Sequence, residues 1–166
     1  MNSHTAEIVW RRAFILGALV LAVLMLHPEP LPAQTDACAL LKADDVAPLL
    51  GGTPTHTASP GGQVCTWIGA NAGRKLVVLT YKNTGVPGEV AFMGARKGAE
   101  AGENAKVSDE TGIGDRAFSG QVPFGAVFVV LKQGRVLQLQ YWTGSQGTSQ
   151  DVAALRPVVQ KTVAAF

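Results

Sequence analysis

Charged residues, histidines and cysteines are scarce in this chain of 166 residues, and their scarcity excludes several functions. Charged residues make up 16% of the sequence, with 14 Lys and Arg against 12 Asp and Glu. No basic run or stripe occurs, so nucleic acid is not an expected partner. The 3 histidines and 2 cysteines do not fall at metal-ligand spacing. We therefore expect no metal and no other cofactor.

The longest apolar run, residues 13–26, is too short for a stable transmembrane helix, which needs about 20 apolar residues. It follows Arg11-Arg12 and precedes Ala33, an order typical of a secretory signal peptide. We expect cleavage after Ala33 to leave a single exported domain, residues 34–166, in the periplasm or outside the cell. No stable transmembrane segment would then remain. Both general secretory and twin-arginine export stay open, and the sequence favours the former.

The only cysteines, Cys38 and Cys65, both lie in the expected mature chain. In an oxidising compartment an isolated pair is typical of one disulfide, here worth about 3.5 kcal/mol on the chain-entropy estimate. A redox or metal pair would need a Cys-x-x-Cys spacing or nearby histidines. The residues before Cys38 do not form a lipidation motif. The sequence therefore predicts a structural Cys38–Cys65 bridge.

The mature chain alternates helical and strand patterns. Apolar spacing and turn residues predict helices over 36–51, 87–102 and 148–166, and strands over 63–68, 75–82, 105–108, 124–131 and 135–142. We expect the first helix to be divided into two short pieces. The residues around His56 are expected to form a loop or a weak edge strand. Short hairpin links imply a mostly antiparallel sheet. We predict an α+β fold in the order helix, strands, helix, strands, helix, with the helices packed on one face.

Several short motifs along residues 36–166 resemble a group of small exported bacterial domains of unknown function. They are Cys38-Ala-Leu-Leu41, the helix end Asp44-Asp45-Val46…Leu49-Leu50-Gly51, Cys65-Thr66-Trp67, Gly112-Ile-Gly-Asp-Arg-Ala117 and the apolar C-terminal helix. Domains of that group are often carried on lipoproteins, especially in actinobacteria. The resemblance implies a sheet packed by helices and a Cys38–Cys65 bridge. It implies no catalytic residue, and this chain lacks the group's frequent lipid anchor.

The segment Gly112-x-Gly114-x-x-Ala117 formally matches a dinucleotide-binding fingerprint. That fingerprint functions only between a strand and the helix that opens on it, because the helix amides bind the pyrophosphate. Here Phe118-Ser119-Gly120 follows, and no helix is expected there. We interpret Gly112, Gly114 and Asp115 as a structural turn in which the glycines supply positive φ and Asp115 accepts hydrogen bonds from amides.

Residues for catalysis are few, and the sequence shows no assembled catalytic set. His56, between Thr55 and Thr57, is the only candidate general base in the expected mature chain. Asp44 and Asp45 are interpreted as carboxylates at the start of a helix, where Asp44 can cap the helix N-terminus. Asp109 and Glu110 are interpreted as solvated charges in a loop. A small hydrolase using His56 with a distant carboxylate remains an alternative.

One strand face suggests binding. In residues 135–142, alternation can direct Leu137, Leu139 and Tyr141 to the core, which leaves Val136, Gln138, Gln140 and Trp142 on the opposite face. Tryptophan offers apolar contact and glutamine offers hydrogen bonds, as sugar or peptide sites require. The alternative is that Trp142 only covers the sheet edge.

These observations favour a non-enzymatic binding or accessory module of the cell envelope. Its expected partner is a small ligand or an envelope protein, and Gln138, Gln140 and Trp142 are its candidate binding residues. An envelope interaction or inhibitor protein that presents the same sheet face is a further alternative.

Overall fold

The structure is a computed structural model, and it describes residues 36–70, 73–81 and 86–166, with the backbone alone for 77–81. Its elements, in chain order, are η1 (Ala37–Leu40, a 3-10 helix), α2 (Ala43–Leu50), β1 (Thr55–Ala58), β2 (Val64–Ile68), β3 (Lys75–Tyr81), α3 (Gly88–Glu100), β4 (Lys106–Glu110), β5 (Arg116–Val122), β6 (Gly125–Lys132), β7 (Arg135–Trp142) and α4 (Ser149–Ala165).

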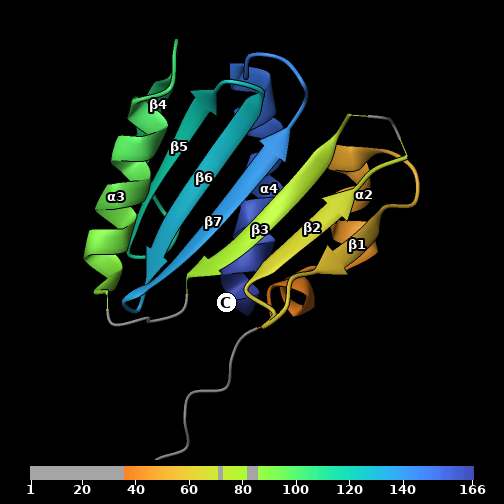
Figure 1. The fold of residues 1–166 in the computed structure, drawn as a ribbon, viewed down its shortest axis with the longest axis horizontal. Helices are drawn as coiled ribbons and strands as arrows, with labels where there is room; N and C mark the ends of the chain where they lie inside the picture. Colours follow the sequence, from red (N-terminus) through yellow and green to blue (C-terminus); the bar gives the residue numbers. More distant parts are fainter. Residues whose placement is uncertain (1–35, 71–72, 82–85) are drawn as a thin grey trace, which may run out of the picture. The chain divides into compact units, whose positions relative to one another are not determined.

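The strands form one antiparallel sheet of seven, in the order β1-β2-β3-β7-β6-β5-β4 (Figure 1). Two antiparallel blocks, β1-β2-β3 and β4-β5-β6-β7, meet where β3 pairs with β7. The α+β class, the antiparallel sheet and the predicted order of helices and strands are therefore confirmed.

One face of the sheet carries the larger core, against η1, α2 and α4. Alternate residues of β6 and β7, including Phe128, Leu137 and Leu139, point into it and meet Val46 of α2 and Leu155 of α4. The Tyr141 hydroxyl donates to the Leu49 carbonyl oxygen at 3.2 Å. Burial of the Tyr141 side chain raises the pKa of its phenol.

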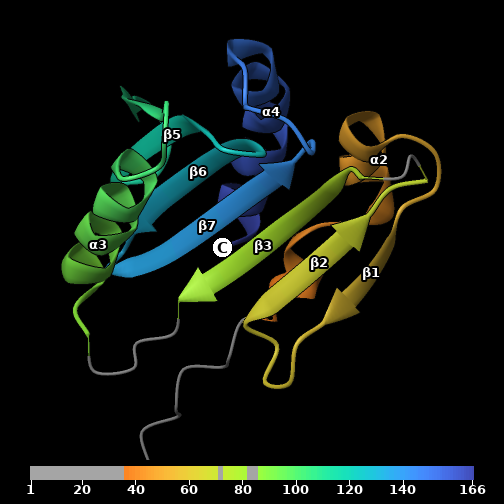
Figure 2. The same ribbon diagram turned by 45° about the horizontal axis from the view of Figure 1, so that its top comes forward.

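Helix α3 lies on the opposite face, which corrects the prediction that all helices pack on one side (Figures 1 and 2). Phe92 of α3 packs there with Phe118, Val127, Val129 and the other members of a second buried cluster, Leu131 and Val136. The physical reason is that nearly every residue of β6 is buried. A strand that is buried on both faces needs packing partners on both faces of the sheet. The unbroken apolar run of β6 is typical of such a strand.

Strand β5 was missing from the sequence prediction. Its centre, Ser119-Gly120-Gln121, consists of weak strand formers, yet β5 pairs along its length with β4 and β6. Ladder pairing on both sides outweighs the local preference.

The N-terminal helical region is divided as predicted, but its cap differs. Asp36 caps η1, and the Asp45 carboxylate accepts from the Lys42 amide at 2.9 Å to start α2, a role that the sequence suggested for Asp44. A disulfide joins Cys38 to Cys65, with the Cα atoms 4.9 Å apart. The bridge links η1 to the second strand of the sheet.

Asp109 and Glu110 are not loop charges, as their sequence context suggested, but residues of edge strand β4. They point to opposite faces, where Asp109 pairs with Arg96 of α3 and Glu110 with Arg156 of α4. Glu110 also accepts from the buried Ser119 hydroxyl at 2.6 Å. One dipeptide thus attaches a helix to each face of the same strand.

Candidate functional site: a groove between α3 and the open sheet face

Strand β7 presents its two faces as its alternating pattern predicts. Leu137, Leu139 and Tyr141 are buried on the α4 side. Gln138, Gln140 and Trp142 are partly exposed and lie on the α3 side, whereas Val136 of the same face is buried beneath α3. The three candidate binding residues therefore share one surface.

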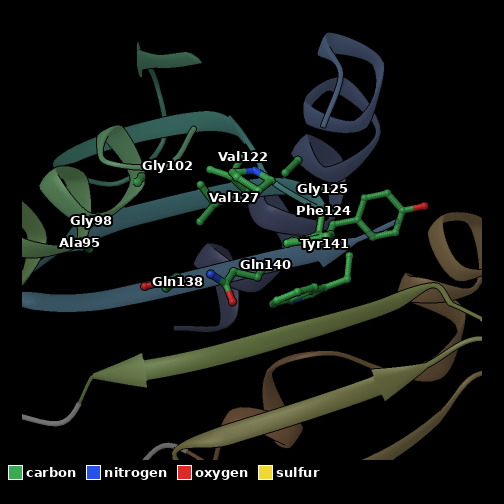
Figure 3. Close-up of a pocket in the computed structure, with 14 residues that line it drawn as sticks. Ala95, Gly98, Gly102, Val122, Phe124, Gly125, Val127, Gln138, Gln140 and Tyr141 are labelled. Carbon is green, nitrogen blue, oxygen red and sulfur yellow. The ribbon is translucent and has the colours of Figure 1, made fainter. Parts of the chain in front are cut away.

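That surface is hollowed into a groove of about 360 Å³, which lies within the size range of small-molecule sites. Figure 3 shows Gln138 and Gln140 on its floor, with α3 as one wall and Phe124 at one end. The lining residues come from α3, the β5–β6 turn, β6 and β7: Ala95, Gly98, Ala99, Gly102, Val122, Pro123, Phe124, Gly125, Ala126, Val127, Gln138, Gln140, Tyr141 and Trp142.

The α3 wall is formed only by alanine and glycine. A Cβ atom added to Gly98 would meet no atom within 4 Å, although Gly98 lies in a helix and lines the groove. Glycine in a helix interior costs about 1 kcal/mol relative to alanine. The missing side chain leaves the groove open at this point.

An aromatic pair closes one end. The rings of Phe124 and Trp142 are stacked with their centroids 6.2 Å apart and their planes 13° from parallel. The Lys75 ammonium lies 4.9 Å from the centre of the Trp142 ring. Contacts from two sides hold the tryptophan in place, so its position is preorganised. Trp142 is the last residue of β7, a strand paired on both sides, so its ring lies at the end of the groove rather than along a lateral sheet edge.

Phe124 occupies an unusual backbone conformation. It follows Pro123 in the two-residue turn between β5 and β6, and its φ of 73° lies in the left-handed region. That region costs about 1–2 kcal/mol for a residue with a Cβ, and glycine would occupy it at no such cost. The side chain is also 55% exposed. Local strain combined with exposure of an aromatic ring is characteristic of functional sites.

The glutamines give the groove neutral hydrogen-bonding capacity. Each side-chain amide offers two N–H donors and one carbonyl acceptor. Among the described residues, the Gln140 side chain has no hydrogen-bond partner, and none of the groove's lining residues is charged. The arrangement suits an uncharged ligand that combines apolar surface with donors and acceptors.

His56 lies outside this groove. It belongs to edge strand β1 and packs on the buried Trp67 ring, with centroids 4.5 Å apart. No carboxylate is hydrogen-bonded to its ring within the described part of the chain. The contact gives His56 a packing role at the sheet margin.

The glycine segment at 112–117 also lies apart from the groove and opens strand β5 rather than a helix. Gly112 and Gly114 both have positive φ, and a Cβ on Gly114 would approach the Leu131 carbonyl oxygen to 2.7 Å. Asp115 accepts from the Gln133 amide at 2.6 Å, so it links this turn to the β6–β7 hairpin.

Sequence reasoning missed Phe124 and the α3 wall. Phe124 was assigned to a strand, although Pro123-Phe124-Gly125 carries the proline and glycine that mark a turn. In α3 the signal is the pair Gly94 and Gly98 within a helical pattern. A helical glycine commonly has a packing or functional reason.

No group of three or more His, Cys, Asp or Glu side chains among the described residues could hold a metal ion. None of their helices has both the length and the apolar character needed to cross a membrane.

Comparison with protein-family models, with curated proteins and with solved structures finds no match to this chain. The resemblance to small exported bacterial domains therefore stays a prediction.

Proposed function

We propose that this protein is an exported, non-enzymatic binding module whose ligand site is the groove between α3 and β7. The observation that carries the proposal is the strained, half-exposed Phe124 stacked beside Trp142 at the end of a groove with a neutral polar floor. Export to the periplasm or the outside rests on the basic and apolar N-terminal pattern. The disulfide supports it, because such bonds persist in oxidising compartments.

A small ligand is favoured over a protein partner at this site. Protein interfaces are centred on broad apolar patches, whereas this site is a concave groove of small-molecule size with glutamine amides on its floor. A flat apolar partner would cover the Gln140 amide without offering it a hydrogen bond, and an unpaired buried amide costs about 1–3 kcal/mol. A polar small molecule can satisfy that amide.

The test is a binding screen on the protein with neutral probes: glucose, N-acetylglucosamine, indole and the tripeptide Ala-Ala-Ala. We expect at least one probe to bind and the substitution Gly98→Leu to abolish binding, because the leucine side chain would fill the groove. The matched control is Gly94→Leu. Gly94 also lies in α3 with nothing within 4 Å of an added Cβ, but it does not line the groove.

Both variants replace a helical glycine by a strong helix former, so both should fold at least as stably as the parent. Equal binding by the Gly98 and Gly94 variants would contradict the assignment of the groove. Binding of no probe would contradict a site for small neutral ligands.

A further inference from the structure

The groove continues onto an open part of the sheet. In Figures 1 and 2, α3 lies over the β4–β7 side, whereas no helix in the described part of the chain lies in front of the same face of β1, β2 and β3. Ile68, which is paired with Lys75 on this face, is 51% exposed. A ligand seated in the groove therefore has a path across three more strands.

Cross-strand pairing places Gln140, Thr66 and Thr57 in one row along that path, and the row crosses β3 at Val77. Gln140 of β7 is paired with Val77, Val77 with Thr66 of β2, and Thr66 with Thr57 of β1. Residues directly opposite each other in antiparallel strands lie on the same face. With about 4.8 Å between neighbouring strands, the row extends about 14 Å from Gln140 to Thr57.

A second row runs alongside it. Trp142 is paired with Lys75, and Lys75 with Ile68. The first row thus offers the Gln140 amide and two threonine hydroxyls, and its neighbour offers an aromatic ring, the Lys75 ammonium and an exposed isoleucine. Together they form a track that runs across the strands and combines hydrogen-bonding groups with apolar contact surface.

We propose that the ligand is an extended, uncharged oligosaccharide, with one sugar ring in the groove and further rings over Thr66 and Thr57. This inference rests on the proposed function of the groove. A sugar ring has apolar C–H groups for the half-exposed Phe124 ring and for the part of the Trp142 ring that Phe124 and Lys75 leave open. It has hydroxyl groups for Gln140 and the threonines. An extended chain matches a track that crosses four neighbouring strands.

The structure disfavours other neutral chains. A peptide bound by strand addition needs an open strand edge, and at the groove β7 is paired on both sides, with β3 and β6. The open edge that the track reaches is that of β1, at its far end, so a peptide added there would not occupy the groove. An acyl chain would cover the Gln140 amide without offering it a hydrogen bond. A sugar satisfies the amide and leaves its outer hydroxyls in water.

The experiment measures the affinity of the protein for β-1,4-linked glucose and N-acetylglucosamine chains of one to five units, with penta-alanine as the peptide probe. We expect affinity to rise about tenfold or more between one unit and four in one of the sugar series. In the double variant Thr57→Val and Thr66→Val, that gain should disappear while monosaccharide affinity is unchanged. Valine matches threonine in shape and suits strands, so the fold should be retained. Thr111→Val, at an exposed threonine in the β4–β5 loop, is the control.

The outcomes separate this inference from the proposed function. Sugar binding that is blocked by Gly98→Leu but independent of chain length would overturn the track and leave the groove as the site. Binding of penta-alanine in place of sugars, again blocked by Gly98→Leu, would overturn the ligand class alone. If Gly98→Leu leaves all binding unchanged, both the proposed groove site and the oligosaccharide track are wrong.

Discussion

At the residue scale, the alternation of β7 could be predicted and the conformation of Phe124 could not. Period-two spacing placed Leu139 in the core and Gln140 on the open face, because a strand's alternation is a local geometric property. Phe124 sits at positive φ because the β5–β6 turn and the adjoining ladder impose it. A phenylalanine in a sequence gives no sign of that conformation.

Replacing the two β7 residues Leu139 and Trp142 by alanine tests the division of the strand into a core face and an open face. Leu139→Ala should lower the free energy of unfolding by about 2–5 kcal/mol, because Leu139 is fully buried. Trp142→Ala should cost well under the 3–5 kcal/mol typical of a buried aromatic. The denaturant midpoints of the two variants measure this difference in stability. If they are equally destabilised, Trp142 belongs to the core and the groove loses its anchor.

Phe124 allows a test of strain in which glycine and alanine give different results. In Phe124→Gly, relief of about 1–2 kcal/mol of backbone strain offsets an aromatic contact worth about 0.5–1.5 kcal/mol. The free energy of unfolding should therefore stay within about 1 kcal/mol of the parent. Phe124→Ala loses the contact and keeps the strain, so it should be the less stable variant. The opposite order in thermal unfolding would show that the backbone at 124 is not strained.

At the element scale, local patterns identified most helices and hairpins but not the side of the sheet that each helix covers. The α4 cap, in which the Thr148 hydroxyl accepts from the Asp151 amide at 3.2 Å, could be read from a four-residue motif. The position of α3 depends on which face of β6 lacks cover, and β6 is apolar on both. Contacts such as Arg96–Asp109 fix the choice, and they join distant parts of the sequence.

The disulfide is the covalent link between η1 and the sheet. Cys65→Ser should lower the free energy of unfolding by about 2–5 kcal/mol, the usual loss for a native bridge in a small domain. Thiol titration of the non-reduced parent protein in denaturant should find no free thiol. Two reactive thiols would contradict the bridge.

The contact between α2 and α4 gives a prediction on pH. A hydrogen bond from the Lys161 ammonium, 2.7 Å from the Asp45 carboxylate, holds the pKa of Asp45 below its usual range, with help from the Lys42 amide. A carboxyl group with a lowered folded pKa stabilises the fold above its unfolded pKa of about 3.9, and this stabilisation is lost as the pH falls further. Asp45→Asn should therefore reduce the loss of stability below about pH 4. Identical acid-unfolding curves for parent and variant would contradict the contact.

At the scale of the whole molecule, composition and order gave the α+β class, and the groove emerged only from the assembled sheet. Its wall, turn and floor come from α3, the β5–β6 connection and β7, which meet through pairings distant in sequence. The polar row likewise joins residues as far apart as Thr57 and Gln140. Export and cleavage after Ala33 stay predictions, since residue 33 lies outside the described residues.

The most direct test of a binding groove is nuclear magnetic resonance of the ¹⁵N-labelled protein titrated with the tightest-binding sugar chain. We expect the Trp142 indole and Gln140 amide signals to shift together and to saturate at one affinity. The indole signal of Trp67, buried on the other face, should stay in place as an internal control. Shifts at Trp67 and His56, with the Trp142 and Gln140 signals unmoved, would contradict a binding site in the groove.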